Sequence, residues 1–488
     1  MEQQHNFYKR RLSSVTHVGN IEIGGENPIR IQSMNTTDTN DTEACVAQAK
    51  RIIDAGGELV RLTTQGSREA ENMKNISARL KADGYPQPLV ADVHFNAHVA
   101  DVAAQYCEKV RINPGNYVDP ARTFKHLEYT DEEYQAELQR IEERLVPFIN
   151  ICKEHHTAVR IGVNHGSLSD RIMSRYGDTP AGIVESCMEF LRIFRKYDFN
   201  DIVISIKASN TVVMVQSVRL LVAAMDKEDM HYPLHLGVTE AGEGEDGRIK
   251  SAVGIGALLT EGIGDTIRVS LSEDPECEIP VAKKLVEMIP ECARLRHEAE
   301  QSIKDDTITL TLNAPDYETF QLKAAMAVGA LLIDRKATKL RIENGELRGM
   351  NSSTNEKLND ESNHTSQFSP LTSQLESLSD SILQAARIKF TKTEYISCPG
   401  CGRTLYNLQD TIQRIKAATS HLVGLKIGIM GCIVNGPGEM ADADYGYVGA
   451  GRGKISLYRK KECIEKNIPE AEAVERLLAF IEEDMKKK

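Results

Sequence analysis

The sequence predicts an α/β protein built on a (β/α)8 barrel, the TIM barrel, with an insertion and a C-terminal α/β domain. In residues 1–280, short runs of β-branched residues alternate with longer amphipathic stretches such as residues 41–53. Eight such units in about 250 residues match the barrel. An open doubly wound sheet would alternate in a similar way, but no Gly-x-Gly-x-x-Gly follows the first run. The barrel is therefore the expected fold.

The eight expected strands are short runs rich in β-branched residues. They lie at residues 29–33, 58–62, 88–92, 109–113, 158–162, 201–205, 233–237 and 266–270. After the last of them, residues 279–289 have the pattern of a helix that completes the barrel.

Three parts are expected along the chain, because 488 residues are too many for one ordinary core. A substrate-binding barrel occupies residues 1–290, an insertion occupies 291–385, and a metal-carrying domain occupies 386–488. Within the insertion, residues from about 345 to 370 are rich in Ser, Asn and Thr, which predicts a mobile linker.

The insertion also contains a weak internal repeat. Residues 323–332 resemble 250–259, and residues 340–342 resemble 267–269 at the same offset. We interpret this as a degenerate copy of the last helix–strand unit of the barrel. Chance similarity between two alanine-rich helices is the alternative.

Composition and charge exclude several classes of function. The formal net charge of −12 argues against nucleic acid or an anionic membrane surface as the main partner. No run is long enough to span a bilayer, and the first residues lack the apolar core of a signal peptide. Six cysteines have no motif spacing, which is typical of a reduced cytoplasmic protein; they are Cys45, Cys107, Cys152, Cys187, Cys277 and Cys292.

Charged and amide side chains recur at the carboxyl ends of the expected strands, where the active site of this fold lies. The candidate ligand-binding residues are Arg61, Arg111, Asn113, Arg160, Asn164, Lys207, Arg268 and Ser270. Five cations at one opening of an acidic chain predict a small, multiply anionic ligand, most plausibly a diphosphate, because guanidinium groups grip phosphate oxygens in pairs. For any single arginine, a surface ion pair is the competing interpretation.

Three residues in the same barrel mouth are candidates for acid–base catalysis. They are Asp92, His94 and Glu240. Each of them could equally be a structural hydrogen-bonding residue.

Three cysteines and a glutamate lie in Gly- and Pro-rich turns of the last hundred residues. Cys398 and Cys401 form a C-x-x-C pair, Cys432 follows the apolar run 426–430, and Glu439 follows the turn Asn-Gly-Pro-Gly at 435–438. Thiolates in such turns suit a soft metal or an iron–sulfur cluster.

Other roles for these cysteines can be compared with a cluster. A structural zinc site normally uses four Cys or His ligands, and neither His421 nor Cys463 is close to these turns in the sequence. A thioredoxin-type pair would not require Cys432, and a disulfide is not expected without a secretion signal. The cluster is preferred, with zinc and purely structural cysteines as alternatives.

Taken together, the two sets of residues resemble the 4-hydroxy-3-methylbut-2-enyl diphosphate synthases, iron–sulfur enzymes of the non-mevalonate isoprenoid pathway. The stretches that carry the resemblance are residues 32–34, 89–95, 111–116, 160–164, 207–209, 237–242, 261–270 and the two cysteine segments.

This resemblance implies a C-terminal domain similar to a sulfite-reductase module, with a 4Fe–4S cluster held by Cys398, Cys401, Cys432 and Glu439. It implies reductive opening of 2-C-methyl-D-erythritol 2,4-cyclodiphosphate to the allylic diphosphate, with two electrons from ferredoxin or flavodoxin. Glu439 then becomes a fourth candidate catalytic residue, because a carboxylate exchanges more readily than a thiolate. Glu240 becomes the candidate proton donor.

The insertion resembles a reduced form of the extra domain found in a three-domain type of this family. The two-domain type works as a dimer whose barrel and cluster come from different chains, so homodimer and monomer both stay open for this chain. Closure of the C-terminal domain onto the barrel is expected. From the residues alone, a zinc-dependent barrel lyase acting on a sugar phosphate and a phosphate-ligand sensor are the alternative functions.

Overall fold

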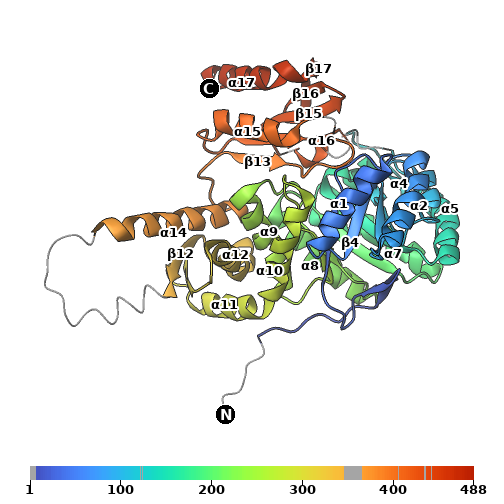
Figure 1. Cartoon of the computed structure of the whole chain (residues 1–488), viewed down its shortest axis with the longest axis horizontal. Coiled ribbons are helices and arrows are strands. Elements are labelled where there is room, and N and C mark those ends of the chain that lie inside the picture. The colour runs from blue at the N-terminus through green and yellow to red at the C-terminus, as the bar shows by residue number, and fades with distance from the viewer. Residues whose placement is uncertain are drawn as a thin grey trace, which may run out of the picture.

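The computed structural model describes residues 7–120, 123, 125–345, 365–404, 406–433, 436–440 and 442–487. It places three bodies together: the barrel, the insertion beside it, and the C-terminal domain above the barrel mouth (Figure 1). No helix within these ranges combines the length and the apolar character that crossing a membrane requires.

Eight parallel strands form the barrel, which confirms the predicted fold. They are β3 (Arg30–Met34), β4 (Leu59–Thr64), β5 (Leu89–Val93), β6 (Lys109–Ile112), β7 (Ala158–Asn164), β8 (Ile202–Lys207), β9 (His235–Leu236) and β10 (Thr266–Ile267). They pair in the order β8-β7-β6-β5-β4-β3-β10-β9. A bridge between Ile204 and Leu234 joins β8 to β9 and closes the ring.

Helices surround this ring (Figure 1). They are α1 (Thr42–Asp54), α2 (Ser67–Ala82), α3 (Ala97–Ala103), α4 (Pro114–Tyr117), α5 (Asp131–His155), α6 (Asp170–Tyr176), α7 (Pro180–Lys196), α8 (Thr211–Lys227), α9 (Gly244–Leu259) and α10 (Glu278–Glu287). Several begin at a side-chain cap: Asp41 accepts a hydrogen bond from the Ala44 N–H, and Asn210 accepts one from the Val212 N–H.

A hairpin that the sequence did not predict closes the lower end of the barrel. It consists of β1 (Thr16–Val18) and β2 (Ile21–Ile23). Val18 and Ile23 pack against an apolar layer inside the barrel that comprises Leu59, Val90, Ala158 and Val203. The hairpin keeps water out of the barrel interior from below.

The insertion contains α11 (Ile289–Gln301), β11 (Thr307–Leu312), α12 (Tyr317–Ile333) and β12 (Lys339–Asn344), and β11 pairs with β12 in parallel. The order of elements is that of α8, β9, α9 and β10. The ammonium of Lys250 on α9 donates to the Glu240 carbonyl, and the ammonium of Lys323 on α12 donates to the Asn313 carbonyl. These shared features support the interpretation of the insertion as a degenerate copy.

Helices α9 and α12 cross at two matched glycines. A Cβ at Gly256 would lie 2.5 Å from Cγ of Met326, and a Cβ at Gly329 would lie 2.7 Å from the Val253 carbonyl oxygen. Each glycine therefore allows the partner helix to approach closely, and the barrel and the insertion share one continuous core.

The predicted polar linker lies mostly outside the described residues. Helix α14 (Thr365–Ala385) already includes its last positions, so the backbone there is helical rather than extended. The helix begins within the predicted linker and ends at Ala385.

The C-terminal domain is a five-stranded sheet in the order β13-β14-β15-β16-β17. Its elements are β13 (Glu394–Ser397), α15 (Leu408–Thr419), β14 (Lys426–Met430), α16 (Gly436–Glu439), β15 (Tyr445–Gly451), β16 (Lys454–Arg459), β17 (Glu462–Pro469) and α17 (Glu470–Lys487). One face packs against α15 and α17. The other packs on Met430 and Met440 beside the cysteine turns.

The helix crossing yields a stability prediction. Alanine normally stabilises a helix interior relative to glycine by about 0.5–1 kcal/mol, but Gly329→Ala should destabilise the protein by about 1–3 kcal/mol because the new methyl group meets backbone. Gly256→Ala should cost less, since its obstacle is the flexible Met326 side chain. Urea unfolding measures both, with Gly451→Ala as the control because nothing lies near its added methyl group. A stabilised Gly329→Ala protein would contradict the crossing.

Candidate functional site

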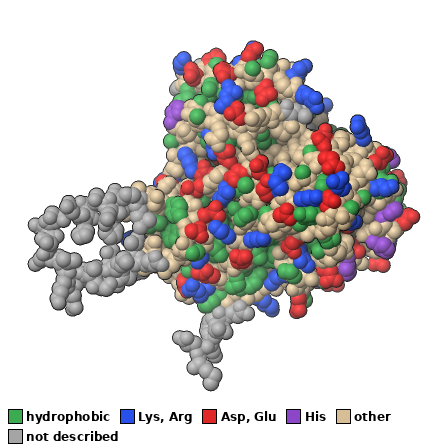
Figure 2. All heavy atoms as spheres, in the orientation of Figure 1, with side chains coloured by type: hydrophobic (Ala, Val, Ile, Leu, Met, Phe, Trp, Pro, Cys, Tyr) green, Lys and Arg blue, Asp and Glu red, His purple; other side chains and the backbone are tan. Residues whose placement is uncertain are grey.

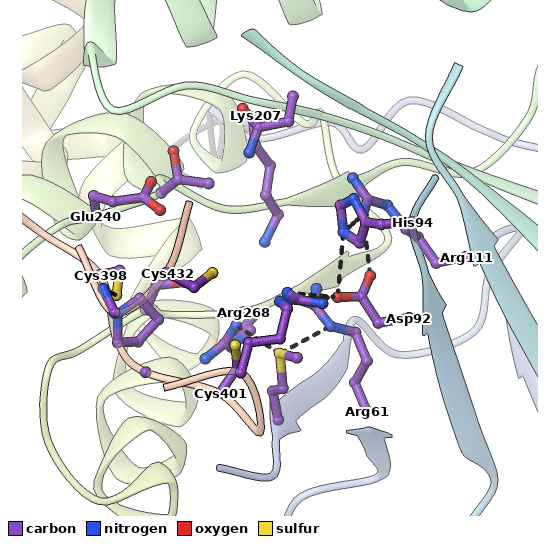
Figure 3. Close-up of a pocket in the computed structure, with 18 of the residues that line it drawn as sticks. Arg61, Asp92, His94, Arg111, Lys207, Glu240, Arg268, Cys398, Cys401 and Cys432 are labelled. Carbon is purple, nitrogen blue, oxygen red and sulfur yellow. Dashed lines mark hydrogen bonds and ion pairs between the residues drawn. The ribbon is translucent and has the colours of Figure 1, made fainter. Parts of the chain in front are cut away.

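A cavity lies between the barrel mouth and the C-terminal domain (Figure 3). Its space, counted together with the open solvent at its mouth, is about 810 Å³. The barrel contributes cationic and carboxyl side chains, and the C-terminal domain contributes the three cysteines of its turns together with Arg403. The two predicted sets of residues therefore face one space.

Asp92 is the buried carboxylate around which three cationic side chains gather. Its oxygens lie 3.1 Å from Arg111 Nη1, 3.5 Å from Arg61 Nη2 and 3.6 Å from Arg403 Nη2. Burial disfavours its charged form, but the Arg61 and Arg111 charges outweigh burial and hold the pKa of Asp92 well below its usual value. Asp92 is thus an anion that orients arginines, including one from the C-terminal domain.

Arg268 has a carboxylate partner of its own. Its Nε and Nη2 donate to the two oxygens of Glu278 at 3.0 and 2.9 Å, a fork-to-fork pair that fixes the guanidinium plane. Glu278 also accepts a hydrogen bond of 2.6 Å from Ser33 Oγ. Because Glu278 engages Nε and Nη2, Arg268 Nη1 is the nitrogen that faces the cavity, 3.7 Å from Met34 Sδ.

Arg160 and Lys207 have no ion-pair partner among the described carboxylates. Arg160 is 1% exposed, and its Nε and Nη1 lack hydrogen-bond partners within the described chain. Burial first, and the Arg61 charge next, lower the pKa values of Arg160 and Lys207 well below their usual ranges. Such a site favours the binding of an anion, whose charge would offset those of Arg160 and Lys207.

His94 is neutral in this environment. Arg111 Nη1 donates a hydrogen bond to His94 Nε2, which requires the unprotonated nitrogen. Burial and the Arg111 charge lower the pKa of His94 to about 3. At neutral pH the ring can therefore accept a hydrogen bond from Arg111 but carries no positive charge.

Glu240 and Glu439 form a buried pair of carboxyl groups. Glu439 Oε2 accepts a hydrogen bond of 3.0 Å from Thr239 Oγ1, while Glu439 Oε1 and Glu240 Oε2 have no partner within the described chain. Burial raises both pKa values, and the proximity of Glu240 raises that of Glu439 further. The Glu240 backbone has φ of +49°, a conformation that non-glycine residues adopt rarely and often at functional sites.

The cysteines are placed by the strand ends of the C-terminal sheet. Cys398 follows β13, and its sulfur accepts a hydrogen bond of 3.1 Å from the Gly431 N–H. Burial raises the pKa of Cys398 to about 12. A hydrogen bond with Cys432 and the Arg403 charge instead lower the pKa of Cys401 well below its usual value.

These residues fit an iron–sulfur cluster by their donor chemistry. Three sulfur ligands border one cavity, and Glu439 Oε1 lacks a partner beside it. No group of three or more His, Cys, Asp or Glu in the described ranges is spaced to hold a single metal ion. A cluster distributes its ligands over several iron atoms, so they need not converge on one point.

The C-terminal domain meets the barrel of the same chain. Ser397 forms a parallel bridge with Ala241, and Ser272 Oγ donates to the Cys398 carbonyl at 3.0 Å. The closest approach is at two glycines, since a Cβ on Gly438 would lie 1.6 Å from the Gly166 carbonyl oxygen. The closed arrangement that was expected is therefore present within one chain.

Most of the predicted residues border the cavity. They are Arg61, Asp92, His94, Arg111, Arg160, Asn164, Lys207, Glu240, Arg268, Ser270, Cys398, Cys401 and Cys432. Asn113 does not: its side chain caps α4 and donates to Ser167 Oγ. Glu439 lies just behind the cavity wall, in contact with Thr239.

Arg403 and Met34 are among the lining residues that had not been named as candidate site residues. Arg403 follows the C-x-x-C-G pattern directly, so its position beside Cys401 was a usable signal. Met34 ends β3 and accepts a hydrogen bond from Arg61 Nε at 3.1 Å. Its role depends on a contact with Arg61 on the neighbouring strand β4, which the sequence alone does not indicate.

Comparisons with known proteins agree with this geometry. Residues 13–283 match the model of the GcpE TIM-barrel domain, and residues 394–483 match that of the GcpE protein C-terminal domain. A Bacteroides fragilis protein named 4-hydroxy-3-methylbut-2-en-1-yl diphosphate synthase (flavodoxin) is 53% identical, over 97% of this chain and 96% of its own. Proteins of the same name from Bacteroides thetaiotaomicron, 53% identical over 99% of both chains, and Akkermansia muciniphila, 43% identical over 98% and 97%, are also similar.

The first of these alignments spans 601 positions, more than the 488 residues of this chain. The relative therefore has segments that this chain lacks. Both domain matches and the extent of identity lead to one conclusion: the chain belongs to the GcpE family.

Proposed function

We propose that this chain is an oxidoreductase that opens 2-C-methyl-D-erythritol 2,4-cyclodiphosphate reductively to 4-hydroxy-3-methylbut-2-enyl diphosphate, a step of the non-mevalonate isoprenoid pathway. Relatives that match almost its whole length carry the name of this synthase. The observation that carries the proposal is the shared cavity, in which three cysteines of one domain face a set of buried cations of the other.

The barrel cations bind the diphosphate. Arg160 and Lys207 form no ion pair with a described carboxylate, so phosphate oxygens would offset the cost of burying them. Arg61, Arg111 and Arg268 are held in fixed orientations by Asp92 and Glu278. Fixed guanidinium planes recognise phosphate with little loss of conformational entropy on binding.

Cys398, Cys401, Cys432 and Glu439 would hold a 4Fe–4S cluster. When bound, such a cluster would relay, one at a time, the two electrons that reductive ring opening takes from the external donor. Arg403 lies beside Cys401 and Cys432, and its charge stabilises their thiolate forms. The same guanidinium reaches Asp92 in the barrel, so it links the thiolates to the substrate site.

Glu240 supplies a proton to the hydroxyl group that leaves. Its raised pKa keeps the carboxyl group protonated at a pH where an exposed glutamate has lost its proton. Its Oε2 has no competing partner within the described chain. His94 is a poor candidate for the same role because its ring is already neutral. It instead helps to position Arg111 through their hydrogen bond.

The closed contact between the domains excludes water from this chemistry. Glu439 belongs to the segment that packs against the barrel, where Ser209 Oγ donates to its carbonyl oxygen at 3.2 Å. A dry site strengthens the electrostatic interactions of the cations and protects reactive species. We propose flavodoxin as the electron donor, since the relatives' names print it, with ferredoxin as the alternative.

The proposal is tested on anaerobically prepared protein with reduced flavodoxin and the cyclodiphosphate. Wild-type protein should contain iron and sulfide and form the allylic diphosphate, whereas Cys401→Ala should lose both the cluster and turnover. Cys463→Ala is the matched control, because this cysteine lies in the same domain away from the cavity and should retain both. Colourless wild-type protein with stoichiometric zinc would contradict the proposal and favour a zinc-dependent lyase.

Replacing Glu240 by Gln tests its role as proton donor. The amide keeps the shape but cannot supply the proton, so kcat should fall by about 10²–10⁴-fold, with iron content and substrate affinity nearly unchanged. Steady-state kinetics and iron analysis measure this. The control is Glu245→Gln, an exposed neighbour outside the cavity. An unchanged kcat in Glu240→Gln would remove Glu240 from the mechanism.

A further inference from the structure

Below the substrate cavity, the barrel interior holds a buried lysine that the mechanism has not used. Lys109 opens β6 and is completely buried. It lies two residues before Arg111, so the two side chains project from the same face of the strand. Arg111 reaches the cavity, and Lys109 does not border it. The ammonium group is therefore beneath the cavity floor, inside the barrel.

Lys109 has no partner for its charge. Its Nζ makes no hydrogen bond within the described chain, and it forms no ion pair with a described carboxylate. The charges that act on it are those of Arg160 and Arg61, and both oppose its own. Burial and these two charges lower the pKa of Lys109 well below its usual value.

The neighbouring interior side chains also lack partners. Both amide atoms of Gln32 and Nε2 of His235 are buried without hydrogen bonds in the described chain. Lys109 and Arg160 act on His235 through their charges, so these residues share one region. TIM-barrel interiors are normally filled by branched apolar side chains, as in the layer of Leu59, Val90, Ala158 and Val203 below.

Two other buried lysines of this chain do have protein partners for their ammonium groups. Lys323 Nζ lies 2.9 Å from both Glu291 Oε1 and the Asn313 carbonyl oxygen. Lys250 Nζ lies 3.4 Å from the Glu240 carbonyl and 3.8 Å from Glu394 Oε1. Lys109 instead resembles Lys207, a cavity residue that also lacks an ion pair.

We propose that Lys109 is a further determinant of diphosphate affinity, a cation below the cavity whose counter-charge is the bound substrate rather than a protein carboxylate. This inference rests on the proposed function. Lys109 acts at a distance, through the low dielectric of the barrel, together with Arg160 and Arg61 above it. In the substrate-free protein the charged form of Lys109 is disfavoured, and a bound diphosphate would stabilise that form.

The test compares Lys109→Met with Lys323→Met, using the cluster-containing protein without reductant so that no turnover occurs. Lys109→Met should raise the Tm of the substrate-free protein by about 2–4 °C, because a buried amino group without a hydrogen-bond partner in the described chain is removed. It should also weaken binding of the cyclodiphosphate by about 10–30-fold. Lys323→Met removes a paired lysine, so it should lower the Tm and leave binding unchanged.

Each result decides between clear alternatives. A lower Tm with unchanged affinity in Lys109→Met would make Lys109 a structural residue and overturn the inference. Lys109→Gln keeps hydrogen-bonding capacity without charge and should weaken binding to the same extent, so the test survives if the methionine variant does not fold. If wild-type protein itself fails to bind the cyclodiphosphate, the proposed function fails, which is distinguishable from failure of Lys109 alone.

Discussion

The arrangement of this protein depends on an imbalance of charge inside the barrel. Arg61, Arg111 and Arg403 share the single carboxylate of Asp92, and Arg268 is paired with Glu278. Arg160, Lys207 and Lys109 are buried without carboxylate partners in the described chain. Burying such groups costs stability. The negative charge of the proposed diphosphate substrate would offset this cost. The net charge of −12 does not contradict this, since these cations are buried, whereas acidic and basic side chains both occupy the face seen in Figure 2.

Closure in one chain brings the electron-carrying domain to that anion. The contact at Gly166 and Gly438 leaves no room for side chains, and the carbonyl and carboxylate of Glu439 bond to the barrel residues Ser209 and Thr239. The insertion lies beside this contact, because α12 packs on α9 and α14 leads toward β13 (Figure 1). The residue that precedes α9's first turn, Glu243, accepts hydrogen bonds from Gln413 and Lys416 of the C-terminal domain. The cis arrangement thus follows from many small contacts.

Much of the fold was predictable because buried parallel strands have a simple signal. All eight barrel strands lie within a few residues of the predicted runs, and the cations at their ends do meet in one cavity. Asn113 shows the limit, since an amide at a strand end can cap the next helix instead of facing the ligand. The sequence did not indicate Lys109 as a candidate site residue, because it lies at the start of its strand and not at the carboxyl end. Its lack of a hydrogen-bond partner in the described chain becomes apparent only in the folded structure. The β1–β2 hairpin was missed because two three-residue strands carry almost no periodic signal.

The central claim is that one chain supplies both the diphosphate site and the cluster ligands of the same active site. Co-producing Arg160→Met and Cys401→Ala chains in one cell and assaying the purified mixture under anaerobic conditions tests it directly. If each site is completed in cis, the mixture should be as inactive as either variant alone. If barrel and C-terminal domain came from different chains, mixed dimers would contain one intact site, and substantial recovery of activity would contradict the account.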